Sequence, residues 1–318
     1  MSKAKKSTKQ ETAIVFGGSG FLGSHVCDAL IERGYKVRVF DQKPSVYLRD
    51  GQTMFVGDIL DRKMVFKAVE GCDYVYNFAG IADLDDASTK PLDTVQLNLV
   101  GNLNIMDAAL KARSKRYVYA STIYVYSEKG GFYRCSKQAS ELYIEEYQRH
   151  YGLDFTILRY GTLYGPRADM RNSIHKYLAE ALRHGAITCA GSIEGVRDYV
   201  HAHDAAALSV QILAPEYNRK HIIISGLHPI KFKEMILIIE EILGKKLKVV
   251  MTNERSAAHY DYTPYSFVPK IGSKLTSNLY TDMGQGLLEC LHEIQVEDPH
   301  WNSNALCEVS STKKKKRG

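Results

Sequence analysis

The sequence predicts an α/β protein, in which a doubly wound parallel sheet is joined to a smaller C-terminal lobe. Two observations predict this fold class. Between residues 12 and 160, short β-rich runs alternate with longer stretches of helical periodicity, which is the pattern of right-handed βαβ units. After residue 160 the alternation weakens and glycine, proline and charged residues cluster, which indicates that residues 161–300 form mainly a smaller, substrate-binding lobe.

Each element follows from a local pattern. The predicted strands are the apolar, β-branched or aromatic runs 13–16, 36–40, 53–56, 74–78, 116–120 and 155–158. Leu22, Val26 and Leu30 stand four residues apart and Gly34 follows as a C-cap, so a helix is predicted there. Further helices are predicted at 61–70, 91–111 and 133–151. The run 222–226 is expected to return from the lobe to the sheet.

Composition restricts the class of protein. The chain has 318 residues, of which 45% are hydrophobic, enough for one large or two smaller cores. The sequence has no apolar run of the length that a membrane helix needs, so no membrane partner is expected. Six scattered cysteines without a CxxC pair indicate reduced thiols, and we expect a cytoplasmic protein.

The net charge of +6 lies largely in two basic tails, residues 1–11 and 301–318. The basic runs in both tails are polar and lack aromatic residues, so we expect the tails to be disordered. The part between them is close to charge balance. We therefore expect no specific nucleic-acid partner.

A glycine-rich turn follows the first predicted strand. Gly17, Gly20 and Gly23 form GxxGxxG between a predicted strand and a predicted helix, a relative of the dinucleotide fingerprint of Rossmann folds. Glycines there permit a tight turn, close approach of backbone amides to a pyrophosphate, and close packing of helix on strand. Asp41 ends the second predicted strand, where a carboxylate accepts hydrogen bonds from ribose hydroxyls and repels a 2′-phosphate. This favours NAD over NADP.

Tyr133 and Lys137 form the candidate catalytic pair. Tyr133 is the only one of 21 tyrosines with lysine four residues later, which places both side chains on one face of a helix. A phenol must lower its pKa from near 10 to about 7 to act as a base, a stabilisation of about 4 kcal/mol, and a neighbouring cation favours the phenolate. Ser121 and Thr122, at the end of the preceding predicted strand, offer hydroxyls to the same cleft.

Taken in order, these motifs resemble the extended short-chain dehydrogenase/reductases. The resemblance rests on the glycine turn, Asn77-Phe78-Ala79-Gly80, Asn98, Thr122, Tyr133xxxLys137, the segment LRYGTLYGPR at 158–167 and GVRDYVH at 195–201, and it spans residues 12–208. Within this superfamily the chain is most similar to the NAD-dependent nucleotide-sugar epimerases and dehydratases, with a layout like that of UDP-galactose 4-epimerases.

The resemblance implies a role for each matching residue. Thr122, Tyr133 and Lys137 match the catalytic set. The matching cofactor contacts are Gly17, Gly20, Phe21, Leu22, Gly23, Asp41, Asp58, Ile59, Phe78, Ala79, Gly80, Asn98, Tyr133, Lys137 and Tyr160. The matching substrate contacts are Thr122, Tyr124, Thr162, Asn172 and Arg197, of which Arg197 would pair with the nucleotide diphosphate.

The implied activity is epimerisation of a nucleotide-diphosphate sugar through a transient keto intermediate, with NAD as cofactor. A homodimer through the helices near 91–111 and 133–151 is implied as well. Ile123 and Tyr124 occupy the positions where related dehydratases carry an acidic pair, which disfavours dehydration, and a glutamate-dependent decarboxylation is disfavoured likewise. A ketoreductase uses the same catalytic set and remains the alternative. A non-catalytic nucleotide- or RNA-binding protein would not need Tyr133 and Lys137.

Two further features are interpreted as structural. His201, His203 and Asp204 resemble part of a metal site, but no third ligand with matching spacing is evident, so no metal is expected. Cys135 lies inside the YxxxK motif without a paired base, and we expect a packing thiol.

Overall fold

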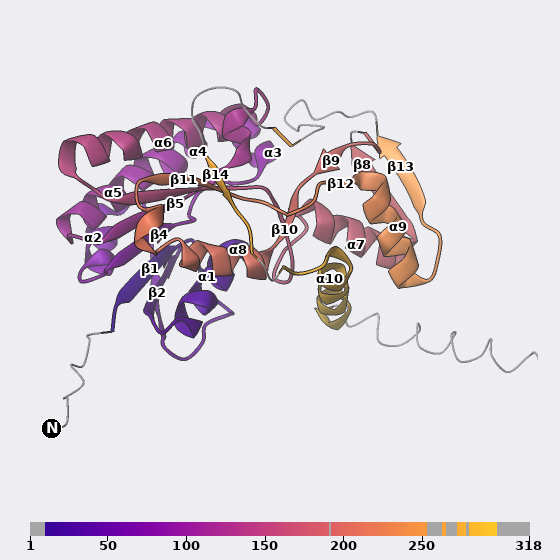
Figure 1. The fold of residues 1–318 in the computed structure, drawn as a ribbon, viewed down its shortest axis with the longest axis horizontal. Helices are drawn as coiled ribbons and strands as arrows, with labels where there is room; N and C mark the ends of the chain where they lie inside the picture. Colours follow the sequence, from indigo (N-terminus) through magenta and orange to yellow (C-terminus); the bar gives the residue numbers. More distant parts are fainter. Residues whose placement is uncertain (1–9, 191, 253–262, 265–271, 278–279, 298–318) are drawn as a thin grey trace, which may run out of the picture.

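The protein is described from a computed structural model, which covers residues 10–190, 192–252, 263–264, 272–277 and 280–297 (Figure 1). The expected tails at 1–11 and 301–318 therefore lie outside the described residues, except for Gln10 and Glu11. Glu11, directly before the first strand, forms an ion pair with Lys115, in which the Lys115 Nζ lies 2.5 Å from the Glu11 Oε1.

Eight strands of the described chain form one sheet in the order β14-β11-β6-β5-β4-β1-β2-β3, and each neighbouring pair is parallel. The strands are β1 Thr12–Phe16, β2 Lys36–Asp41, β3 Gln52–Val56, β4 Tyr74–Asn77, β5 Arg116–Thr122, β6 Phe155–Tyr160, β11 Lys220–Ile224 and β14 Ser273–Leu275. This arrangement confirms the predicted fold class. Because the strand order reverses between β1 and β4, the carboxyl ends of these two strands form the switch point at which such sheets bind ligands.

Helices cover both faces of the sheet (Figure 1). On one face α1 (Phe21–Glu32) and α8 (Ala202–Gln211) pack on a core that includes Val15, Val39 and Ile224. The opposite face is covered by α2 (Arg62–Val69), α5 (Gly101–Lys111) and α6 (Gly131–Tyr151). The sheet is therefore buried on both sides, as its almost continuous apolar strands require.

The predicted helix 91–111 is interrupted. It consists of α4 (Pro91–Val95), a π-helical turn (Gln96–Val100) and α5, and a short α3 (Leu84–Thr89) precedes it. π turns are rare and occur often at functional positions. Here the wide turn contains Asn98, one of the expected cofactor contacts.

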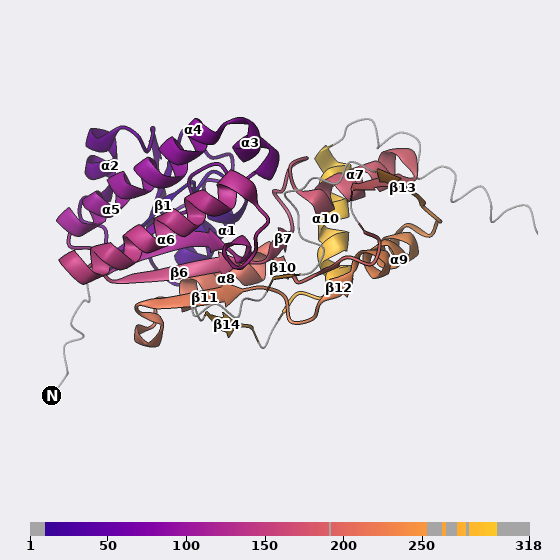
Figure 2. The same cartoon turned by 90° about the horizontal axis from the view of Figure 1, so that it is seen from above.

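The chain leaves the sheet at the end of β6 and enters the lobe directly (Figure 2). The lobe contains α7 (Ser173–His184), α9 (Phe232–Leu243) and α10 (Met283–Glu297) around one apolar core. Short strand pairs complete it: β7 (Thr162–Tyr164) with β10 (Tyr199–His201), β8 (Ala186–Ala190) with β13 (Lys248–Thr252), and β9 (Val196–Arg197) with β12 (Ile230–Lys231). Three elements after residue 160, α8, β11 and β14, belong to the sheet layer and not to the lobe.

Among the described residues, no helix is long and apolar enough to cross a membrane. The five cysteines in the described part of the chain are all free. Two short 3₁₀ helices, Ile123–Tyr126 after β5 and Pro215–Tyr217 after α8, complete the elements.

Candidate functional site

The glycine turn lies at the carboxyl end of β1, where backbone and helix approach closely. Gly17 has φ +77°, and a Cβ there would lie 2.7 Å from the backbone nitrogen of Ala79. A Cβ on Gly23 would lie 2.1 Å from the Gly17 carbonyl oxygen. Gly20 precedes α1 without a side-chain cap, so the first amides of α1 remain available to an anion. This is the cradle that a dinucleotide pyrophosphate requires.

Asp41 stands beside this turn at the end of β2. Its carboxylate accepts hydrogen bonds from the backbone amide of Ser19 at 3.1 Å and from that of Lys43 at 3.3 Å. The carboxylate is thus fixed at the rim of the glycine turn, and its half-exposed position leaves lone pairs for further donors. The sequence-predicted ribose acceptor is therefore next to the predicted pyrophosphate cradle.

Asp58 and Ile59 follow β3 and differ from each other. Asp58 accepts a hydrogen bond from the backbone amide of Leu60 at 2.9 Å and is half-buried at the sheet edge. The Ile59 side chain lies in the core under α5, where a Cβ on Gly101 would clash with it. Ile59 therefore offers a ligand its backbone and not its side chain.

Asn98 links the segments around the expected nicotinamide site. Its buried amide accepts from the backbone nitrogen of Ile81 at 2.7 Å and donates to the Ile81 carbonyl and to Ser136, both at 2.9 Å. Gly80 has φ +138°, and a Cβ there would lie 2.3 Å from the Asn98 Oδ1. Asn98 thus holds the loop after β4 against α6, so its side chain positions neighbouring residues.

Aromatic rings line the same edge of the sheet. Phe78 stacks on Tyr76 and is tilted against Tyr160. The Tyr160 hydroxyl is 2.6 Å from the Ser209 Oγ in α8. Its hydroxyl is therefore engaged inside the fold, and the expected contact of Tyr160 with a cofactor is restricted to its ring and backbone.

Tyr133 and Lys137 meet on one face of α6, beside the end of β5. They are 9% and 5% exposed. The Lys137 Nζ lies 5.8 Å from the Tyr133 ring centroid and donates to the Ala120 carbonyl at 2.7 Å. Burial lowers the pKa of Lys137 to about 8, against the attraction of Glu141. A cation in this poorly solvated position acts strongly on a neighbouring phenol, because little water screens the interaction.

Thr122 ends β5 and is buried, and its hydroxyl accepts from the backbone amide of Tyr124 at 3.3 Å. Tyr124 packs edge-on against Tyr133 with ring centroids 6.3 Å apart. The structure therefore brings together the predicted catalytic threonine, tyrosine and lysine, with Tyr124 as a half-buried neighbour.

Sequence reasoning missed the ion pair behind this group. Glu141, one helical turn after Lys137, is 1% exposed and lies 2.7 Å from the Arg159 Nη2, whose side chain is 0% exposed. The Glu141 carboxylate also accepts from the Ser121 hydroxyl at 2.6 Å. The pair therefore links α6 to the end of β5 through the residue next to Thr122. An acid one turn after the YxxxK lysine was the available signal.

The expected substrate residues lie in the lobe and at its entry. Thr162 begins β7, and its amide donates to the Asp198 carbonyl at 3.2 Å. Asn172 caps α7: its Oδ1 accepts from two backbone amides and its Nδ2 donates to the Leu163 carbonyl at 2.8 Å. Arg197 is half-buried in β9. The side chain of Asn172 is thus already used within the fold, and contact of these three with substrate stays a prediction.

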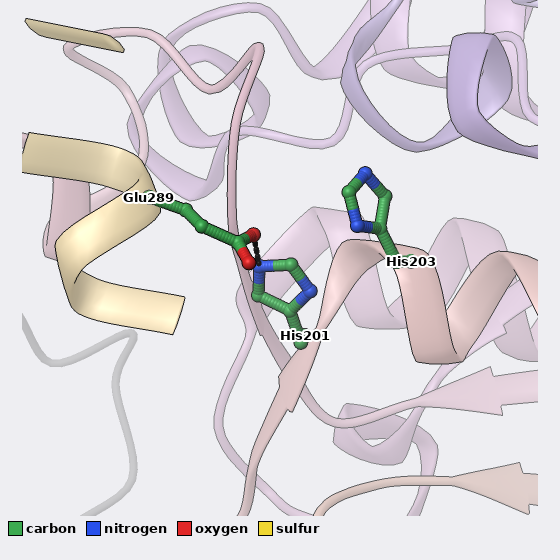
Figure 3. A group of neighbouring side chains, drawn as sticks. All are labelled: His201, His203 and Glu289. Atoms are coloured by element: carbon green, nitrogen blue, oxygen red, sulfur yellow. Dashed lines mark ion pairs between the residues drawn. The ribbon is translucent and has the colours of Figure 1, made fainter. Parts of the chain in front are cut away.

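The structure places a third side chain with a metal-ligating atom beside His201 and His203. No third ligand for His201 and His203 was evident from the sequence, but Glu289 of α10 lies next to them (Figure 3). Asp204 instead accepts from the backbone amide of Thr281 at 2.7 Å and is not part of this group. The spacing of Glu289 along the chain gave no signal, because α10 reaches this place only by folding of the lobe.

Curated relatives are similar in sequence over most of the length of this chain. One is described as a putative UDP-glucose 4-epimerase of Methanocaldococcus jannaschii, 30% identical over 224 residues, which are 63% of this chain and 72% of the relative. A UDP-glucuronate 4-epimerase of Thermodesulfobacterium geofontis is 25% identical over 264 residues, which are 74% of this chain and 81% of the relative. A UDP-N-acetyl-alpha-D-glucosaminuronate decarboxylase of Bacillus cytotoxicus is 25% identical over 268 residues, which are 76% of this chain and 83% of the relative.

Solved structures share the fold. A UDP-glucose 4-epimerase of Thermotoga maritima, solved with UDP-glucose, superposes with a TM-score of 0.78 at 24% identity, covering 90% of this chain and 99% of that one. A UDP-glucuronic acid 4-epimerase of Bacillus cereus, solved with UDP-glucuronic acid and NAD, superposes with a TM-score of 0.79 at 21% identity. The match covers 90% of this chain and 100% of that one. The model of the NAD dependent epimerase/dehydratase family matches residues 13–224, which include the glycine turn, Asp41 and the catalytic group. This chain belongs to the NAD-dependent epimerase/dehydratase family, and its cofactor is NAD.

Proposed function

We propose that this protein is a nucleotide-sugar epimerase that inverts one sugar carbon through a transient keto intermediate. The observation that carries the proposal is the buried pair of Tyr133 and Lys137 beside Thr122, at the edge of the sheet that holds the glycine turn. Ile123 and Tyr124 follow Thr122, so those two positions hold no carboxylate for eliminating water. Similarity to proteins described as UDP-sugar 4-epimerases supports the same reaction.

In the proposed reaction Tyr133 removes the proton from the sugar hydroxyl at the carbon that is inverted. Lys137 stabilises the phenolate form of Tyr133, and the Thr122 hydroxyl holds the reacting oxygen by a hydrogen bond. The glycine turn and Asp41 would hold the NAD, which would supply reversible hydride transfer at that carbon.

The keto sugar then turns within the site and presents its other face. Tyr133, which now carries the proton, gives it back to the oxygen as the alcohol is re-formed, so the proton balance closes within one turnover. Burial of Tyr133 and Lys137 keeps this proton away from bulk water. The enzyme thereby ends in the state in which it began.

In this proposal Arg197 binds the nucleotide diphosphate. A guanidinium pairs bidentately with phosphate oxygens, and β9 carries Arg197 in the lobe that follows the active edge. Thr162 and Tyr124 are proposed to contact the sugar. Asn172 supports the site through the start of α7, where its side chain caps the helix.

The proposal is tested by the nucleotide that the purified protein retains and by its reaction without added reductant. An epimerase keeps its cofactor between half-reactions, so denatured protein should release near-stoichiometric NAD⁺ or NADH, identified by mass spectrometry. The native protein should interconvert one epimeric pair among UDP-, GDP-, CDP- and dTDP-sugars. Net oxidation of added NADH or NADPH with consumption of a keto sugar would instead show a reductase.

Asp41→Ala should weaken NAD binding about tenfold and narrow the preference over NADP. The substitution removes both the acceptor for the ribose hydroxyls and the charge that repels a 2′-phosphate. Titration of both cofactors by calorimetry measures the change. Asp50→Ala, an exposed aspartate in the following loop, is the matched control and should bind both like the native protein. A native protein that binds NADP more tightly than NAD would overturn the assignment of Asp41.

A homodimer in the cytoplasm is also part of the proposal. The helices near 91–111 and 133–151 expose large apolar side chains, Leu92 and Val95 on α4 and Leu142 and Tyr143 on α6. An apolar surface on such helices suits pairing as a four-helix bundle around a two-fold axis. The free cysteines of the described chain agree with a reducing compartment.

A further inference from the structure

Three side chains with metal-ligating atoms meet between the sheet layer and the lobe. His201 ends β10, His203 lies in the first turn of α8, and Glu289 projects from α10 (Figure 3). One ligand atom of each lies within 4.8 Å of the others. Elements from both parts of the protein therefore contribute to one cluster that the proposed epimerase reaction does not use.

Buried polar atoms of His201 and Glu289 lack hydrogen-bond partners among the described residues. The His201 side chain is 0% exposed, and both of its ring nitrogens are buried without a hydrogen-bond partner, as is the Oε2 of Glu289. The His201 Nε2 and the Glu289 Oε2 lie 3.4 Å apart, but they do not form a hydrogen bond. Buried polar atoms are nearly always paired, and an unpaired group in a native structure indicates a missing ligand, water or ion.

Close packing holds His201 in place. A Cβ on Gly286 of α10 would lie 3.0 Å from the His201 Cδ2, and one on Gly165 would lie 3.1 Å from its Nε2. The Tyr164 ring packs edge-on against the imidazole with centroids 5.1 Å apart. Because backbone approaches the ring on both sides, the ligand cannot turn away, which reduces the entropy cost of binding an ion.

His203 is held from the other side by α1. The His25 ring packs edge-on against the His203 ring with centroids 4.8 Å apart, and its Nε2 contacts the Pro166 carbonyl oxygen at 3.0 Å. His25 is thus fixed by the loop before Arg167 and supports the orientation of His203. The same loop is tied to α10, since the Arg167 amide donates to Glu293.

We propose that His201, His203 and Glu289 bind a Zn²⁺ ion that joins α10 of the lobe to the β10–α8 junction. Two imidazoles and one carboxylate form a donor set typical of zinc sites with an open fourth position. Neighbouring ligands around tetrahedral Zn²⁺ stand about 3.4 Å apart, which is the separation already present between His201 and Glu289. His203 is exposed and Glu289 is half-exposed, so small movements of these two side chains complete the site.

An access route for the ion is present at the surface. A hollow of about 450 Å³ is lined by Pro166, Glu289, His292, Glu293 and Val296. Glu289 therefore lies both in the cluster and on the wall of the hollow. The open side of the ion faces this hollow, so a water molecule is its fourth ligand. The carboxylates at the entrance attract the cation.

Equilibrium dialysis of the full-length, chelator-treated protein against micromolar Zn²⁺, followed by metal analysis, tests the proposal. We expect about one Zn²⁺ per chain that raises the Tm. Glu289→Gln and His203→Gln should each weaken binding about 100-fold and abolish the Tm increase, because each removes one ligand. His184→Gln is the matched control: this exposed histidine lies on α7 of the lobe, outside both the cluster and the hollow, and should leave both values unchanged.

Replacement by Co²⁺ identifies the donor atoms. The visible absorption of bound Co²⁺ should show a tetrahedral ion without thiolate charge transfer, and Glu289→Gln should remove it. Circular dichroism of each apo variant confirms that the fold is retained. Zn²⁺ binding that is equal in native protein and both ligand variants, a thiolate spectrum, or no binding at micromolar Zn²⁺ would each overturn the proposal. None of these results depends on the epimerase activity.

Discussion

Tyr133→Phe should lower turnover about 10²–10⁴-fold, while the fold and NAD binding stay close to those of the native protein. The phenylalanine keeps the ring that packs against Tyr124 and lies 5.8 Å from the Lys137 Nζ. Only the hydroxyl that takes and returns the proton is lost. Turnover with the epimeric nucleotide sugar, measured beside retained NAD and thermal stability, separates a catalytic from a structural effect.

Tyr151→Phe is the matched control for this experiment. Tyr151 lies at the end of the same helix, α6, and its side chain is exposed. Loss of its hydroxyl should leave turnover unchanged. If Tyr133→Phe retained native turnover, another group would have to be the base, and the proposed role of Lys137 would lose its basis as well.

Glu141→Gln should lower the free energy of unfolding by about 3–5 kcal/mol, because it leaves the guanidinium of Arg159 buried without its counter-charge. Glutamine preserves the shape of the side chain, so the loss reports charge and not a cavity. The Glu141 carboxylate contacts Arg159 through both oxygens, at 3.0 and 2.7 Å, and both side chains are almost fully buried. Urea unfolding followed by circular dichroism measures the change.

Glu146→Gln provides the comparison on the same helix. Glu146 is 47% exposed and pairs with Arg149 and His150 at the surface, where an ion pair contributes at most about 1 kcal/mol. Its substitution should therefore hardly change the unfolding midpoint. A Glu141→Gln variant as stable as Glu146→Gln would mean that Arg159 finds other partners, such as Tyr126 and His221, and does not need the carboxylate.

The sequence predicted those features that depend on neighbours along the chain. The strands from β1 to β6 begin and end within two residues of the predicted runs, because alternation and β-branched residues mark buried strands directly. Tyr133 and Lys137 share one face of α6, as a spacing of four residues on a helix requires. The glycine turn lies between β1 and α1 for the same local reason.

The sequence was less informative where the backbone departs from regular geometry. Helical periodicity over 91–111 is continuous, yet the chain inserts a π turn around Asn98. The extra residue places the Asn98 amide against the loop after β4, with hydrogen bonds to Ile81 and Ser136. Such a turn is decided by tertiary hydrogen bonds, which do not appear in the hydrophobic pattern.

By itself the sequence determined the parallel sheet, the dinucleotide cradle of Gly17, Gly20 and Gly23, and the spacing of Tyr133 and Lys137, because each depends on the periodicity and capping of a single element. Only the tertiary structure decided which distant side chains meet. Arg159 on β6 neutralises Glu141 on α6, and Glu289 on α10 reaches His201. Both contacts arise when separate elements bury their apolar faces against one another, and the residues brought together in this way are far apart in the chain.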